Sequence, residues 1–357
     1  MKLINKWHMG NPLLREPKKK MTKSKFYFTL FSFFLLIHGQ NIFIVSAKEN
    51  NFLKGVKFTG EYPEKRDDGS GAFRTHCVES HIKNDDPLMF YGEPGKSHLH
   101  VFFGNPSTDS YSTIESLSNI QTTSCDGINV NKSAYWVPAL IDSFGNRIRY
   151  IDPLFYYKTG YHIPARDIIP PPNGLKIIAG NALSNYPQSE DIAKFRCASW
   201  KSSATWFDKG DPLDHINFIP NCPINDLLEI RIVFPQCWDG KTLNGGDFKS
   251  HMAYPIKAIP PNTGTGRCPK THPFPIPEIS YNFAIYVTDE TGPSKNWRFS
   301  SDGKNTDLGG FSIHADWING WKPSIIKTIV ENCLRKAVDC GVGLLGKGYE
   351  LRPVKLE

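Results

Sequence analysis

Short strand-like segments, each closed by turn residues, constrain the fold of this chain more than any other feature of its sequence. They are rich in Ile, Val, Tyr and Phe, which fit a pleated sheet, and they are bounded by Pro, Gly, Asn and Asp. The segments are 135–141, 148–152, 154–157, 175–179, 230–234 and 281–288. One helical pattern, from Pro323 to Ala337, repeats Ile and Val at three- and four-residue spacing. We therefore predict an all-β, sandwich-like fold with long ordered loops and a short C-terminal helix.

The N-terminus predicts a targeting segment over residues 1–47. Basic residues between Lys2 and Lys25 precede an apolar run from Phe26 to Ile37, and Val45-Ser46-Ala47 provides the small residues that signal peptidase requires. The apolar run is interrupted by His38 and Gln40 and is shorter than the roughly 20 residues of a spanning helix. We therefore expect a secreted protein without stable membrane insertion, in which residues 48–357 form one β-rich domain. Met1 and Met21 both remain candidate start sites.

The charge of the mature chain excludes one class of partner. The formal net charge is +7, but residues 1–47 hold eight of the 42 basic and one of the 35 acidic residues, which leaves 34 of each. No Lys/Arg-rich run remains, so the sequence does not favour binding to nucleic acid.

The cysteines predict a disulfide framework. All eight lie in the mature part and none forms a C-x-x-C pair, which favours oxidation in the secretory pathway over a zinc ribbon. They are Cys77, Cys125, Cys197, Cys222, Cys237, Cys268, Cys333 and Cys340. Nearness in sequence suggests the pairs Cys333–Cys340 and Cys237–Cys268 and leaves the other four cysteines open. Asn131-Lys132-Ser133 is the one N-glycosylation sequon, which predicts a glycoprotein with a surface loop there.

Three short segments carry the chemistry expected of a site. In an extended chain alternate side chains share a face, so His98 and His100 should stand side by side. Two later segments each place a carboxylate near an imidazole: Asp247 with His251, and His314 with Asp316. Histidine titrates near neutral pH and binds metals, so these residues predict one composite site. The alternative is that the rings only form hydrogen bonds within an aromatic-rich core.

Several stretches taken in order resemble the secreted family called domain of unknown function nineteen-ninety-six, found chiefly in fungi and bacteria and sometimes joined to WSC carbohydrate-binding modules. They are SHLH (97–100), GN (104–105), YWVPAL (135–140), GLKIIAG (174–180), FRC (195–197), FPQCWDGK (234–241), KSHMAYP (249–255), CP (268–269), HP (272–273), HAD (314–316) and GW (320–321). The resemblance spans about residues 55–340 and implies secretion and the composite histidine site. This chain has Ser97 and Phe248 where filamentous fungi tend to carry further histidines.

Three functions remain open. The first is an enzyme, a polysaccharide hydrolase or lyase, with His98, His100, His251, His314, Asp247 and Asp316 as candidate catalytic residues. Trp238, Asp239, Lys249 and Trp317 are then the candidate substrate-binding residues, since aromatic faces suit sugar rings. The second is a non-catalytic module that binds carbohydrate, or an effector-like module, with structural histidines. In both cases the expected partner is an extracellular or cell-wall glycan.

The third function is a site for a divalent metal such as zinc or copper. A same-face pair of imidazoles and one distant histidine make a three-point cage, with His98, His100 and either His251 or His314 as ligands. We take His251 as the third ligand in this hypothesis, with Asp247 or Asp316 as a further one.

Overall fold

Antiparallel strands make up most of the regular structure of the chain. The computed structural model describes residues 54–198, 215–257, 264–303 and 307–354, all within one compact unit, Val45–Glu357. The predicted targeting segment lies outside the described residues. Within them, no helix has the length and apolar character needed to cross a membrane.

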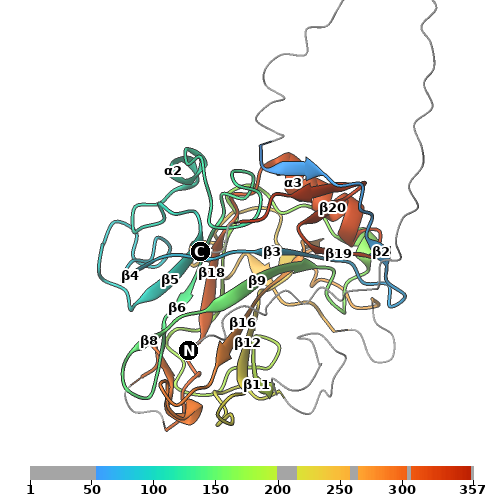
Figure 1. The fold of residues 1–357 in the computed structure, drawn as a ribbon. Helices are drawn as coiled ribbons and strands as arrows, with labels where there is room; N and C mark the ends of the chain where they lie inside the picture. The colour runs from blue at the N-terminus through green and yellow to red at the C-terminus, as the bar shows by residue number, and fades with distance from the viewer. Residues whose placement is uncertain (1–53, 199–214, 258–263, 304–306, 355–357) are drawn as a thin grey trace, which may run out of the picture. The chain divides into compact units, whose positions relative to one another are not determined.

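The largest sheet has seven strands and is antiparallel except for the pair of β19 and β3 (Figure 1). In spatial order its strands are β11 (Ala193–Ala198), β12 (Leu227–Val233), β16 (Glu278–Tyr286), β9 (Ile151–Lys158), β3 (Ala72–His76), β19 (Val338–Val342) and β2 (Glu64–Lys65). The second sheet has five antiparallel strands. Their order is β10 (Lys176–Gly180), β18 (His314–Ile318), β6 (Ala134–Pro138), β5 (His100–Gly104) and β4 (Glu79–Lys83).

Smaller elements cap these two sheets. Three three-stranded sheets contain β1 (Val56–Phe58), β21 (Tyr349–Leu351) and β20 (Leu344–Gly346); β14 (Met252–Ala253), β13 (Cys237–Trp238) and β15 (Phe274–Pro275); and β17 (Arg298–Phe299), β7 (Leu140–Ile141) and β8 (Arg147–Ile148). The helical segments are α2 (Ile114–Ser118), η1 (Ala165–Asp167), η3 (Ser294–Asn296), α3 (Pro323–Ile329) and η4 (Val330–Leu334). The predicted C-terminal helix is thus confirmed as α3 and η4, and Pro323 occupies its first turn.

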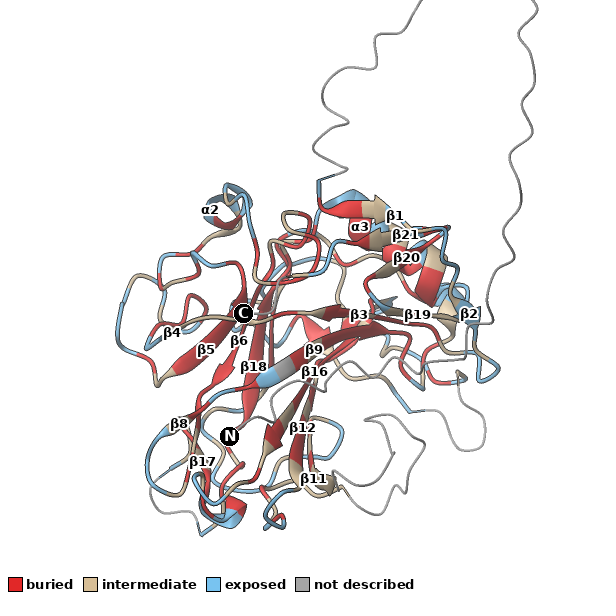
Figure 2. Cartoon of the chain, viewed as in Figure 1, coloured by how far each residue is buried: buried red, intermediate tan, exposed pale blue. Residues whose placement is uncertain are grey.

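The core lies between the two large sheets and makes the fold a sandwich. Alternate residues of each strand point inward, and aromatic rings from the two sheets meet there. Tyr135 of β6 packs on Phe155 of β9 with ring centroids 4.6 Å apart, and Tyr157 of β9 contacts Trp317 of β18 at 6.2 Å. Figure 2 shows β5, β6 and β18 buried along their whole length. The predicted all-β sandwich is therefore confirmed.

The five-stranded sheet is buried on its outer face as well. A second apolar cluster there contains Phe102 and Trp136, which stack with centroids 5.7 Å apart, and Leu88 and Leu117 pack over it from the loop after β4 and from α2. Because these segments cover the outer face, polar side chains on β5 and β18 are also removed from water. This second layer encloses the site described below.

Four disulfides tie the loops to the sheets. They are Cys77–Cys125, Cys197–Cys222, Cys237–Cys268 and Cys333–Cys340. The two pairs suggested by nearness in sequence are both present.

The expected surface position of the sequon is wrong. The side chain of Asn131 is fully buried. Its Oδ1 accepts hydrogen bonds from the Tyr135 hydroxyl at 3.0 Å and from the Ser133 amide at 3.3 Å. A glycan on the Asn131 amide would have to occupy the packed interior, so the folded domain cannot carry one there.

Candidate functional site

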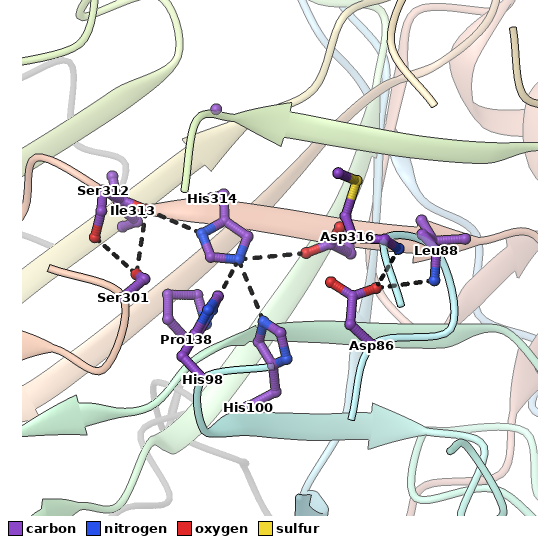
Figure 3. A network of polar contacts seen from close by, with 12 residues as sticks. Asp86, Leu88, His98, His100, Pro138, Ser301, Ser312, Ile313, His314 and Asp316 are labelled. Atoms are coloured by element: carbon purple, nitrogen blue, oxygen red, sulfur yellow. Dashed lines mark hydrogen bonds and ion pairs between the residues drawn. The ribbon is translucent and has the colours of Figure 1, made fainter. Parts of the chain in front are cut away.

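The register of the five-stranded sheet brings two distant histidines together. β6 lies between β5 and β18, and Pro138 pairs with His100. Asp316 pairs with Trp136, and the same register continued by two residues places His314 opposite Pro138. Neighbouring strands are about 4.8 Å apart, so the rings of His100 and His314 reach toward each other across the proline (Figure 3).

His98 completes a group of three imidazoles. It stands two residues before His100, and its ring centroid is 4.2 Å from that of His100, as the predicted same-face arrangement requires. The Nε2 atom of His314 lies 3.2 Å from Nε2 of His98 and 3.2 Å from Nε2 of His100. The three ligand nitrogens all lie within 4.8 Å of one another. His100 and His314 are buried, whereas His98 is half-buried, so the group opens to solvent beside His98.

Backbone carbonyls fix how two of these rings are protonated. The Nδ1 atom of His100 donates to the Asp85 carbonyl at 2.9 Å, and Nδ1 of His314 donates to the Ser312 carbonyl at 2.9 Å. A carbonyl oxygen only accepts, so both Nδ1 atoms carry hydrogen. In the neutral rings the two Nε2 atoms therefore present lone pairs to each other.

Burial keeps the three rings neutral. It lowers the pKa of His98 to about 4 and the pKa of His314 to about 3. The pKa of His100 falls well below its usual value, first through burial and then through repulsion from the other two rings. At neutral pH neither facing Nε2 atom carries a proton that could form a hydrogen bond to the other, so the lone pairs repel. Such a group has the donor atoms of a ligand set for a cation, and its Nδ1–H···carbonyl bonds are of the kind that orient metal-binding histidines.

Asp316 extends the group along β18. It follows His314 by two residues on the same face, and its Oδ2 lies 3.8 Å from the His314 Nε2. The carboxyl is buried, and among the described residues neither of its oxygens has a hydrogen-bond partner. Burial raises the pKa of Asp316 well above its usual value, and the neighbouring Asp86 carboxylate raises it further. An unpartnered carboxyl beside three imidazole lone pairs again indicates a place for positive charge.

Lys249 lies at the edge of this group. Its Nζ donates to the Gly180 carbonyl at 2.7 Å, and Gly180 pairs with His314 in the sheet. Its positive charge acts on both His314 and Asp316. Lys249 thus brings a positive charge next to His314 and Asp316.

The other two predicted catalytic residues, Asp247 and His251, are not members of the three-imidazole group. Asp247 is bound within its own turn by the Lys249 amide at 3.0 Å and the Ser250 amide at 2.7 Å. Burial lowers the pKa of His251, and the charges of Asp239 and Asp247 only partly oppose this shift. His251 is absent from the three-imidazole group. His314 therefore takes the place that the metal hypothesis gave to His251.

The two tryptophans predicted to bind substrate, Trp238 and Trp317, both pack against other parts of the protein. Trp317 is fully buried in the core, because it follows Asp316 directly and so points to the opposite face of the sheet. It cannot stack on a substrate beside the histidines. Trp238 packs against Phe274 and donates its Nε1–H to the Thr242 carbonyl at 2.7 Å. Asp239, the other candidate in that turn, accepts hydrogen bonds from the amides of Lys241 and Thr242.

Sequence reasoning missed the loop that covers the site. Asp85 supplies the carbonyl that orients His100, and Asp86 accepts from the amides of Leu88 and Met89 at 2.8 and 3.0 Å (Figure 3). These two adjacent acids precede the His98 segment and could have indicated the loop. They are far from the other motifs along the chain, so the sequence gives no reason to group them with the site.

Comparison with known proteins identifies one family. The model described as "Domain of unknown function (DUF1996)" matches residues 86–321, which include every member of the histidine group. No curated protein and no solved structure matches the chain.

Proposed function

The chain belongs to the DUF1996 family, and we propose that it is a secreted, metal-dependent hydrolase of acyl groups carried by extracellular or cell-wall polysaccharide. The ion is divalent, with zinc as the best fit, and His98, His100 and His314 are its ligands. Activity, metal and substrate are all part of this proposal.

One observation carries it, namely the convergence of the Nε2 atoms. Nitrogens bound to one zinc ion at about 2.0–2.1 Å with tetrahedral angles are about 3.3 Å apart. The separations of 3.2 Å from His314 to each of the other two rings agree with that value. His81, by contrast, satisfies both ring nitrogens within the protein, with Ser80 and Thr108. In the histidine group, the Nε2 atoms of His98 and His100 instead both face Nε2 of His314.

The surroundings suit hydrolysis. A divalent ion with three protein ligands keeps a position for water, lowers the pKa of that water and polarises a carbonyl oxygen. Asp316 lies beside the ligands and has no competing hydrogen bond among the described residues, so it is placed to accept a proton from water. Lys249 is placed to stabilise the negative charge that develops on an acyl oxygen. Esters and amides therefore suit this site better than the glycosidic bond, which has no carbonyl.

The extracellular setting is supported by two features. Residues 1–47 have the pattern of a signal peptide, and four disulfides persist only in an oxidising compartment. Polysaccharide is the abundant acylated polymer there. We therefore place the substrate on a glycan.

Release of acetate from acetylated polysaccharides tests the proposal. The mature protein should release acetate, lose this activity after dialysis against a zinc chelator, and regain it when zinc is returned. His314→Ala should be inactive, whereas the control His81→Gln, a substitution in the same sheet, should keep its activity. Activity that resists the chelator and survives His314→Ala, or no acetate release from any acetylated glycan, would overturn it.

A further inference from the structure

The seven-stranded sheet turns a charged face away from the core. In β12, Ile230 and Ile232 point into the sandwich, so Arg231 points outward. Lys194 of β11 is its direct cross-strand partner. Two cations therefore stand side by side on the outer face of this sheet. The histidine group lies on the outer face of the other sheet.

A cleft of about 180 Å³ lies over this pair. Lys194 and Arg231 line it together with Tyr161, Phe234, Tyr254 and Pro255. The Tyr254 hydroxyl donates to the Val233 carbonyl at 2.9 Å, which fixes one aromatic wall. The cleft thus combines a cationic floor with flat, ring-shaped walls.

In the described part of the chain, Lys194 and Arg231 face each other as like charges on this floor. Like charges directly opposite each other in a sheet are destabilising. Arg231 lowers the pKa of Lys194 more than any nearby acid raises it, and burial lowers it most. Lys194, Arg196 and Arg231 also add to the burial that lowers the pKa of His215. The Nε of Arg231 is buried and has no hydrogen-bond partner among the described residues.

Three acids also line the cleft, and two of them form ion pairs with other cations. The third, Glu190, raises the pKa of Lys194 less than Arg231 lowers it. Glu278 binds Lys158 at 3.0 Å, and Asp191 binds Lys257 at 2.5 Å. Glu229 pairs with Arg196. Within the described residues, Glu278, Asp191 and Glu229 thus pair with cations other than Arg231 and Lys194, which leaves this pair open to an anion from outside the chain.

We propose that this cleft binds an acidic sugar, with its carboxylate on Arg231 and Lys194 and its ring against Tyr254, Tyr161 and Pro255. The guanidinium fork matches a carboxylate in a bidentate manner. Aromatic faces suit the apolar face of a sugar ring. Glu190, Glu278 and Asp191 line the same cleft, where their free carboxylate oxygens would accept hydrogen bonds from hydroxyls and repel a group with two negative charges. A singly charged, hydroxylated ligand is therefore favoured over a phosphate.

Calorimetric titration of the mature protein with glucuronate tests this binding. The titrations are made with a zinc chelator present, so that they do not depend on the histidine group. Glucuronate should bind, whereas glucose and inorganic phosphate should not. Arg231→Met and Lys194→Met should each weaken binding at least tenfold, and His314→Ala and the exposed control Lys336→Met should leave it unchanged.

The melting temperature without ligand provides a second readout. Removing one of two apposed cations relieves repulsion, so Arg231→Met should melt higher than the wild type. A purely structural arginine would behave in the opposite way. Equal binding of glucose or phosphate, no binding of glucuronate, or a lower melting temperature with unchanged binding in Arg231→Met would each overturn the proposal.

Discussion

Zinc should stabilise the folded protein by an amount that the site and the size of the domain determine. A ligand that binds only the folded state at 100 times its dissociation constant adds about 2.7 kcal/mol to the free energy of unfolding. Unfolding entropy is about 2.1 cal/mol/K per residue, so the unit Val45–Glu357, of roughly 300 residues, has about 0.6 kcal/mol/K. The melting temperature should therefore rise by about 4 °C, and by about 6 °C at a thousandfold excess.

Differential scanning calorimetry of chelator-treated protein, with and without zinc, measures this shift. His314→Ala also loses packing, but each variant is compared with its own zinc-free form, so the packing loss cancels. The shift should vanish in His314→Ala and persist in His81→Gln, whose ring nitrogens bond to Ser80 and Thr108. An equal shift in His314→Ala, or no shift in the wild type, would refute the reasoning.

Three further predictions concern acid, disulfides and glycosylation. Because the folded state lowers the pKa of His98 to about 4 and of His314 to about 3, the unfolded chain binds more protons between about pH 4 and 6.5, and stability of the metal-free protein should fall with acid. Urea titrations at pH 7 and 5 should show a smaller fall in the free energy of unfolding for His314→Gln than for the wild type. An equal fall would contradict the lowered pKa of His314. Loop-closure entropy predicts a loss of about 4 kcal/mol without Cys77–Cys125, which spans 48 residues, and of about 2.4 kcal/mol without Cys333–Cys340, which spans 7. A larger fall in the urea midpoint without Cys333–Cys340 than without Cys77–Cys125 would exclude loop closure as the explanation. Mass spectrometry of protein secreted from a eukaryotic host should find Asn131 unmodified, and a glycan there in folded protein would contradict its burial.

Local pattern was enough to predict the sandwich and several of its strands. The segment 281–288 falls largely within β16, and 230–234 falls largely within β12. Alternation alone placed His98 and His100 together, because that relation needs only the geometry of one strand. The helix from Pro323 followed from its apolar spacing in the same way.

The order and register of strands far apart in the chain could not be predicted from the sequence. His314 meets His100 only because β6 lies between their strands and presents Pro138 there, and no local pattern specifies that order. For the same reason the sequence does not distinguish His251 from His314 as the third ligand, although Asp239 and Asp247 are the acids that act on His251. Alternation along the strand does predict that Asp316 and Trp317, as neighbours in β18, point to opposite faces of the sheet. Burial of Asn131 depends on Tyr135, which the sequon does not reveal.

X-ray absorption at the zinc edge tests the central claim most directly. In protein loaded with one equivalent of zinc, the account predicts three imidazole nitrogens at about 2.0–2.1 Å together with an oxygen ligand. The His314→Ala spectrum should lose an imidazole contribution or show no protein-bound zinc, and that of His251→Ala should match the wild type. A wild-type spectrum with fewer than three imidazoles, or one unchanged by His314→Ala, would contradict a metal centre at His98, His100 and His314.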